Sequence, residues 1–314
     1  YPITIDVTSP DLPTATNTVT IKPNTGVTSS ISGSSTSSIF KLNGADYIII
    51  DGSNAVSGTT KDLTISNTST SASTSTIWVA SKGTGAGATN NTIKNCIINA
   101  GSVSVATTYG IFVGGATIGT TGDDNDNITI QNNTIGTSYI GVYAQANTTG
   151  ILNNLTITQN TIGSSTDASS VGNIGISLAQ GTGGVVSNNE IFNIKVGTNA
   201  KGVLVSTGIV SSSFSKNKIY AIRYTGTTGY GGKGFDVSTG NSSSNLTFDN
   251  NMIYDITGDG YSGTSDNICG FRLAGGGGYN FYYNSVNLYG SISRSGATAD
   301  ISAAMFIISG VTNL

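Results

Sequence analysis

Apolar and polar residues alternate in short segments that recur along the chain, and each segment runs into an Asn pair followed by another apolar residue. The pattern is clearest at residues 127–135, NITIQNNTI, and it returns at 155–162 and 246–253. Looser copies occupy 63–68, 93–98, 186–191, 214–219 and 281–286. Alternation with a period of two predicts β-strands and argues against helices.

The second Asn of each segment defines a column whose members lie 27 to 37 residues apart: Thr68, Cys96, Asn133, Asn160, Asn189, Asn217, Asn251 and Asn284. A Gly-Φ-x-Φ motif, where Φ is apolar, begins between these segments at residues 110, 141, 175, 202, 234 and 270. Repeats of this length are typical of solenoids. One copy of each motif per repeat indicates at least two strands per turn, and we expect three.

The sequence therefore predicts an all-β fold, a right-handed parallel β-helix of about 8–10 coils of 27–38 residues. We expect one domain over residues 1–314. Residues 1–60 would form N-terminal coils without the Asn motif, and residues 61–314 would form the Asn-motif coils. No amphipathic helix is expected as a cap at the N-terminal end.

The Asn column has a mechanical explanation. The chain must turn sharply within two residues, and Asn tolerates left-handed backbone while its amide bonds to nearby main chain. Stacked coils lie about 4.8 Å apart, so amides on successive coils can also bond to one another. We predict a structural ladder made of Asn133, Asn160, Asn189, Asn217, Asn251 and Asn284.

Composition narrows the choice of partners. Charged residues make up 9% of the chain against about 25% in ordinary domains, while 37% of residues are apolar. The net charge is −3 and no basic patch interleaves with aromatic residues, so nucleic acid is a poor candidate partner. No apolar run reaches the ~18 residues of a membrane span, so no membrane insertion is expected. A first residue other than Met is compatible with a processed start or with a cut fragment.

Several single residues carry expectations of their own. Cys96 and Cys269 lie several coils apart, beyond disulfide reach, so we expect both to be reduced. Trp78 is expected on an outer face, because its neighbours alternate inward. Tyr279 is expected in the core, whereas Tyr282 and Tyr283 are expected outside, where aromatic side chains can bind sugar or another protein.

Two segments make a family resemblance specific: KLNGADYIIIDG at residues 41–52 and NNTIKN at 90–95. Together with the repeats they resemble the parallel β-helix units of the pectate-lyase-like superfamily, and in particular repeats of large secreted or surface proteins of Bacteroidota-type bacteria. The resemblance covers essentially the whole chain. It implies a right-handed β-helix, export, and often a place within a longer polypeptide. The superfamily includes lyases, hydrolases, adhesins and passive stalks, so the fold leaves function open.

An acidic loop offers a candidate metal site. Asp123, Asp124 and Asp126 lie within five residues and could supply oxygen ligands to Ca²⁺, although the spacing of an EF-hand is absent. The alternative is a solvated polar turn. A weaker acidic loop contains Asp255, with Asp259 and Asp266 further along.

Catalytic residues cannot be assigned from the sequence. Asp236 and Asp249 lie in predicted strands with Arg223, Lys233 and Arg272 nearby, but the chain has no His for acid–base chemistry. Paired carboxylates for glycoside hydrolysis are not evident. Asp236 and Arg272 share the same offset after their glycines, which predicts a cross-coil ion pair, a type of contact that usually contributes little.

The main prediction is a structural protein without catalysis: an extracellular or cell-surface stalk, adhesin or self-assembling filament subunit. Its expected partners are further copies of itself, end to end, or the remainder of a longer chain. The alternative is a carbohydrate-binding or polysaccharide-degrading module with polysaccharide as its partner. Its site would be a shallow groove beside the loops at residues 225–233 and 258–267.

Overall fold

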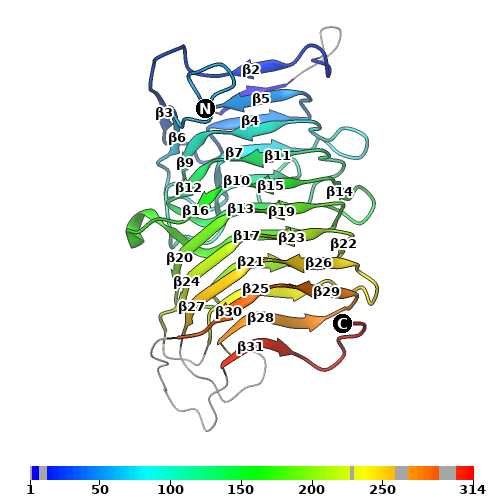
Figure 1. The fold of residues 1–314 in the computed structure, drawn as a ribbon. Helices are drawn as coiled ribbons and strands as arrows, with labels where there is room; N and C mark the ends of the chain where they lie inside the picture. Colours follow the sequence, from blue (N-terminus) through cyan, green and yellow to red (C-terminus); the bar gives the residue numbers. More distant parts are fainter. Residues whose placement is uncertain (1, 7–12, 227–229, 259–267, 290–301) are drawn as a thin grey trace.

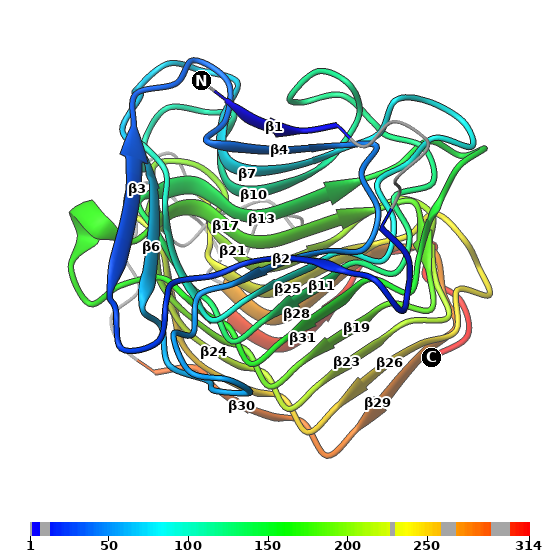
Figure 2. The same ribbon diagram turned by 90° about the horizontal axis from the view of Figure 1, so that it is seen from above.

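A computed structural model describes residues 2–6, 13–226, 230–258, 268–289 and 302–314. The chain winds into a solenoid whose coils stack from the N-terminal to the C-terminal end (Figure 1). Viewed along the stack, three sheets enclose one interior (Figure 2). All paired strands are parallel, and the neighbours in each sheet come from successive coils. The predicted fold, an all-β right-handed parallel β-helix, is confirmed.

Sheet A has ten strands among the described residues. They are β1 (Ile3–Ile5), β4 (Phe40–Asn43), β7 (Thr74–Ala80), β10 (Thr108–Gly114), β13 (Ser138–Gln145), β17 (Val171–Ala179), β21 (Lys201–Val205), β25 (Lys233–Ser238), β28 (Ile268–Gly275) and β31 (Ser302–Ile307). Six of them, β10, β13, β17, β21, β25 and β28, contain the Gly-Φ-x-Φ motifs predicted above.

Sheets B and C each have nine strands in the part of the chain that the structure describes. Sheet B contains β2 (Val19–Ile21), β5 (Ile48–Asp51), β8 (Thr92–Lys94), β11 (Thr129–Gln131), β15 (Thr156–Thr158), β19 (Val185–Ser187), β23 (Ser213–Ser215), β26 (Leu246–Asp249) and β29 (Tyr279–Tyr282). Sheet C contains β3 (Ser29–Gly33), β6 (Leu63–Asn67), β9 (Cys96–Asn99), β12 (Thr134–Gly136), β16 (Thr161–Ile162), β20 (Glu190–Val196), β24 (Lys218–Tyr224), β27 (Met252–Thr257) and β30 (Ser285–Asn287).

Smaller elements complete the coils. A short fourth sheet joins β14 (Leu152–Asn153), β18 (Gly181–Thr182) and β22 (Ile209–Val210). One turn of 3₁₀ helix, η1 (Asp167–Ser169), lies in a loop between sheets C and A. Among the described residues no helix is long and apolar enough to cross a membrane.

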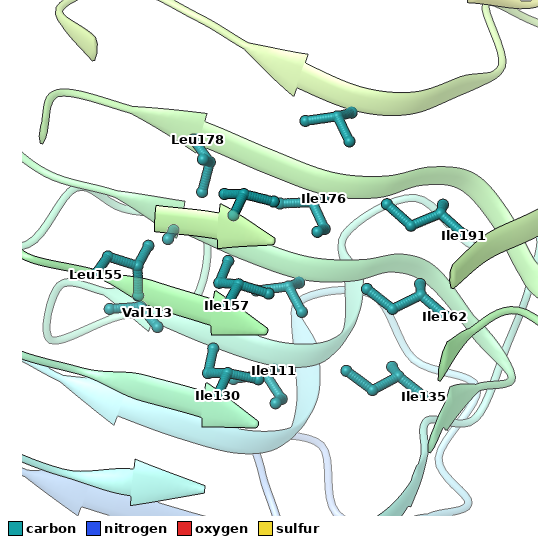
Figure 3. Close-up of a cluster of buried hydrophobic side chains, with 14 of the residues drawn as sticks. Ile111, Val113, Ile130, Ile135, Leu155, Ile157, Ile162, Ile176, Leu178 and Ile191 are labelled. Atoms are coloured by element: carbon teal, nitrogen blue, oxygen red, sulfur yellow. The ribbon is translucent and has the colours of Figure 1, made fainter. Parts of the chain in front are cut away.

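The core is a continuous apolar column inside the three sheets. Register keeps like residues together, since Ile130 of β11 pairs with Ile157 of β15. On sheet C, Ile135, Ile162 and Ile191 lie one above another (Figure 3). All five side chains are buried. At roughly 1.5–3 kcal/mol for each buried aliphatic side chain, these stacks are the main source of stability.

The corner between sheets B and C carries the asparagine ladder. The Oδ1 atom of Asn160 accepts hydrogen bonds from the main-chain N–H and the side-chain amide of Asn133, at 2.9 and 3.1 Å. In the same way, Oδ1 of Asn189 accepts from the main-chain N–H and the side-chain amide of Asn160, at 3.0 Å for both bonds. The pattern continues through Asn217 and Asn251 to Asn284. Each rung therefore satisfies buried groups of the coil before it.

Left-handed backbone belongs to the residue before each rung. Asn132 has φ of 51° and Asn188 has φ of 55°, whereas their successors are not in the left-handed region. The two properties attributed above to one Asn are thus divided between the two members of the pair. A second, more exposed stack of asparagines precedes sheet B, where the Nδ2 atom of Asn127 donates to Asn90 at 3.1 Å and that of Asn154 to Asn127 at 3.0 Å.

Most single-residue expectations are met. Both cysteines are buried reduced thiols, as expected, and Cys96 occupies the ladder column, where its N–H donates to Oδ1 of Asn133 at 3.0 Å. Tyr279 is buried, while Tyr282 and Tyr283 are 51% and 84% exposed. Trp78 lies on the outer side of sheet A, as predicted, but it is buried there rather than open to solvent.

Candidate functional site

The outer face of sheet A carries aromatic, aliphatic, polar and charged side chains. Its central column consists of the residues at position x of the Gly-Φ-x-Φ motifs and of the residues that pair with them in strands without the motif. These side chains point away from the core: Lys41, Trp78, Phe112, Tyr143, Ser177, Leu204, Asp236 and Arg272. The column therefore begins with Lys41, continues through aromatic residues, a serine and a leucine, and reaches the charged residues Asp236 and Arg272.

The N-terminal half of this face is an aromatic patch formed by Trp78, Tyr109, Phe112 and Tyr143. The rings of Phe112 and Tyr143 are stacked, with centroids 5.6 Å apart. Ile118, from the loop after β10, packs on the patch, which explains why Trp78 and Phe112 are buried on an outer face. Burial, together with the neighbouring Tyr143, raises the pKa of Tyr109 to about 12.

A charged cluster of Lys201, Asp236 and Arg272 occupies the other half. The carboxylate of Asp236 lies 2.9 Å from Nζ of Lys201 and 2.7 Å from Nη1 of Arg272. Its side chain is 4% exposed, whereas those of the two cations are each 17% exposed. Burial alone would raise the pKa of Asp236, but the two cations outweigh burial and hold this pKa below its ordinary value. The carboxylate is therefore ionised and enclosed, and the cations reach the surface.

A second lysine adjoins the cluster. Lys233 pairs in register with Lys201, is almost fully buried, and donates from Nζ to Oδ1 of Asn199 at 2.8 Å. Asn199 belongs to the turn that leads into β21, so this bond ties the turn to the next coil. The contact holds the backbone beside Lys201 in place.

The structure brings together only some of the candidate residues. The predicted ion pair of Asp236 and Arg272 is present, but Lys201 had no assigned role in the sequence. Asp249 lies on sheet B, away from this face, and Arg223 on sheet C pairs with Asp255 at 2.6 Å. Asp259, Asp266 and most of the loop at residues 258–267 lie outside the described residues.

The acidic loop does not assemble a metal site. Asp123 accepts from Asn147 at 2.8 Å, Asp124 from the N–H of Gly85 at 2.7 Å, and Asp126 from Asn153 at 2.8 and 2.9 Å. The three carboxylates thus serve different neighbouring loops and strands. In the described part of the chain no group of three or more His, Cys, Asp or Glu side chains could hold a metal ion. The Ca²⁺ expectation therefore finds no support in this geometry.

Comparisons with known proteins bear on the fold. No family model matches the chain, and no curated protein sequence matches it. Solved structures do match. The DFA-IIIase of Arthrobacter chlorophenolicus A6 has 13% identity and a TM-score of 0.46, covering 88% of this chain and 67% of the other. An alginate lyase of Paenibacillus has 15% identity and a TM-score of 0.43, covering 86% and 88%.

A third match is the GH136 lacto-N-biosidase of Eubacterium ramulus, with 10% identity, a TM-score of 0.47, and coverage of 96% of this chain and 58% of the other. At such identities the likeness concerns the fold. It nevertheless corrects the main prediction, because the similar chains are named as carbohydrate-active enzymes. The hypothesis of a stalk, adhesin or filament subunit without catalysis is wrong on this comparison.

Proposed function

We propose that this chain is a polysaccharide-active β-helix module that binds an acidic polysaccharide across the outer face of sheet A. The observation that carries the proposal is the charged cluster, in which Asp236 is enclosed while Lys201 and Arg272 are partly exposed. A ligand approaching this face meets cations first. Two cations held by a buried carboxylate are preorganised to bind a sugar carboxylate, because their positions are fixed before the ligand arrives.

The chemistry of the cluster favours elimination over hydrolysis. Glycoside hydrolysis needs two carboxyl groups, one of which donates a proton. Asp236 is the only carboxylate in the described strands of sheet A, and its lowered pKa makes it a poor proton donor. In β-elimination the proton beside a uronate carboxylate is removed, a C=C bond forms as the C–O bond to the leaving sugar breaks, and the leaving oxygen takes up a proton. Water that reaches the partly exposed cluster would accept the first proton and supply the second, and negative charge develops on the uronate in between. Lys201 and Arg272 would stabilise that charge, and Asp236 would act as a positioning residue.

The distances along sheet A fit an extended ligand. Tyr143 and Asp236 belong to one column and are three strands apart, which corresponds to about 14 Å at about 4.8 Å per strand. A chain running along the axis would pass over the half-buried Tyr143 and the charged cluster together. A polymeric substrate further implies an extracellular location for the module. Association with further copies or with the rest of a longer chain stays a prediction.

The proposal is tested with a panel of acidic and neutral polysaccharides. Binding is measured by affinity electrophoresis, and cleavage by release of unsaturated uronide with and without Ca²⁺. We expect an acidic polymer to be bound, with an affinity that falls as salt rises. Lys201→Ala should weaken binding about tenfold, equivalent to ~1.4 kcal/mol.

The matched control is Lys94→Ala, which removes a lysine that also pairs with a largely buried carboxylate, at 3.3 Å, but on sheet B. It should leave binding unchanged, and circular dichroism establishes that both variants are folded. If folded wild-type protein neither binds nor cleaves any acidic polymer, the proposal is wrong. Binding without release of unsaturated product would limit the module to recognition.

A further inference from the structure

A separate hollow opens at the turn between sheets C and A, beside η1, which lies in the loop projecting from the side of the solenoid in Figure 1. Its volume is about 310 Å³, at the lower end of the roughly 300–1,000 Å³ of ligand pockets. Its walls come from four coils, which contribute Val103, Asp167, Lys195 and Thr225 among others. We call it the η1 pocket.

One side of the η1 pocket carries a preassembled polar set. The carboxylate of Asp167 accepts from Nδ2 of Asn193 at 2.9 Å and from Nζ of Lys195 at 2.7 Å. Asn193 is held in turn by a 2.7 Å bond from the same Nδ2 to the carbonyl of Ser164. The Asp167 side chain is nevertheless 60% exposed, so its oxygens remain accessible. The set offers both donors and acceptors and has no net charge.

The opposite side is apolar and built with close backbone contact. Val103 and Val171 line it, and Ala168 adds an exposed methyl group. A Cβ atom on Gly172 would overlap the carbonyl oxygen of Val103, so only glycine lets the loop at residues 101–107 lie against this strand. The apolar side of the η1 pocket therefore depends on glycine at position 172.

The η1 pocket adjoins the charged cluster. Gly172 lies two residues before Ile174, and Ile174 pairs in register with Lys201 of the next coil. Gly172 of the pocket and Lys201 of the cluster therefore lie near the N-terminal ends of neighbouring strands of sheet A, β17 and β21. A ligand held at Lys201 could extend into the pocket without crossing the core.

We infer that the η1 pocket is a subsite for one hydroxyl-bearing sugar ring of the polysaccharide, recognised through its diol and not through a carboxylate. Asp167 would accept from two ring hydroxyls, Lys195 would donate to another, and the apolar wall would cover the C–H face of the ring, while Asn193 holds Asp167 in place. The exposed carboxylate of Asp167 disfavours a sugar carboxylate here. This inference rests on the proposed function, because it assigns a second part of the same binding site.

The test follows the methyl group of Ala168 by NMR in alanine-methyl-labelled full-length protein, with the resonance assigned by its loss in Ala168→Ser. The probes are oligogalacturonides, oligomannuronates and neutral cello-oligosaccharides of increasing length. We expect longer oligosaccharides that bind the charged cluster to shift the Ala168 resonance as well. Asp167→Ala should remove that shift and weaken binding of the longer probes about tenfold, while binding of the shortest probes is unchanged.

The matched control is Glu190→Ala. Glu190, on the same strand β20 as Lys195, forms an exposed ion pair with Lys218 of β24 at 2.9 Å, but it does not line the pocket. The control should change neither the resonance nor the affinity.

The outcomes separate the two proposals. If Lys201→Ala abolishes binding but no bound probe shifts Ala168, the charged cluster is supported and the η1 pocket is refuted. If probes shift Ala168 and bind equally well to Lys201→Ala, the pocket is supported and the role of the charged cluster is refuted. A wild-type protein that binds none of the probes contradicts both.

Discussion

Replacing one asparagine of the ladder should destabilise the solenoid far more than the small area of that side chain would suggest. Asn160 is buried, and its Oδ1 accepts from the N–H of Asn133 at 2.9 Å. Its Nδ2 donates to the carbonyl of Ile130, also at 2.9 Å. Asn160→Ala would leave this N–H and one side-chain amide hydrogen of Asn133 buried without their acceptor. At about 1–3 kcal/mol for each unsatisfied group, the free energy of unfolding should fall by about 2–6 kcal/mol.

The matched control for Asn160→Ala lies on the next coil. Asn188 is exposed, has φ of 55°, and immediately precedes a rung. Asn188→Gly keeps the left-handed backbone accessible and removes no rung, so it should change stability by less than about 1 kcal/mol.

Urea denaturation followed by circular dichroism compares Asn160→Ala with this control. Solenoid coils depend mainly on their neighbours, so unfolding need not be two-state. Amide hydrogen exchange at Asn133 therefore supplies a local measurement, and its N–H should lose protection in Asn160→Ala. Unchanged exchange at Asn133 together with a stability within about 0.5 kcal/mol of wild type would refute the reasoning.

Two further predictions concern the glycine column and acid stability. A Cβ on Gly141 would lie 2.6 Å from the carbonyl oxygen of Gly175, so Gly141→Ala should lower the thermal midpoint, whereas Gly197→Ala, with open space around it, should not. Because the folded-state pKa of Asp236 is lowered, its stabilisation is complete above the ordinary pKa of about 3.9 and is lost as pH falls through the folded value. Denaturation midpoints measured below about pH 5 should show this loss in wild type and not in Asp236→Asn.

The interior of the solenoid could be predicted from sequence because its signals are local and repeated. Ile130 and Asn133 recur at fixed offsets in successive coils, and period-two alternation places such residues on one face. The different roles of the two residues in each Asn pair could not be predicted from the sequence. The sequence shows two asparagines, but only the backbone shows that Asn132 takes the left-handed conformation and that its successor forms the rung.

The candidate site was only half predictable, for a reason that lies in the backbone. Strict alternation from Val203 places Lys201 on the inner face, and this is why it had no assigned role. A Cβ on Gly202 would instead overlap Ile219 of the core, so both Gly202 and Val203 face inward and the alternation slips by one residue. Lys201 therefore emerges on the outer face, where it reaches Asp236. The burial of Trp78 on the outer face could not be predicted either, because Ile118, which packs in the same cluster, lies in a loop without a periodic pattern.

The residues that build the solenoid occupy different positions from those that can vary for function. Ladder and glycine positions such as Asn160 and Gly141 contact the next coil directly, so a change there propagates along the stack. Outer-column residues such as Arg272 contact their neighbours mainly through side chains, and the main-chain ladder beneath them is independent of their identity. Substitutions at Arg272 should therefore alter polysaccharide binding more than stability, and those at Asn160 the reverse.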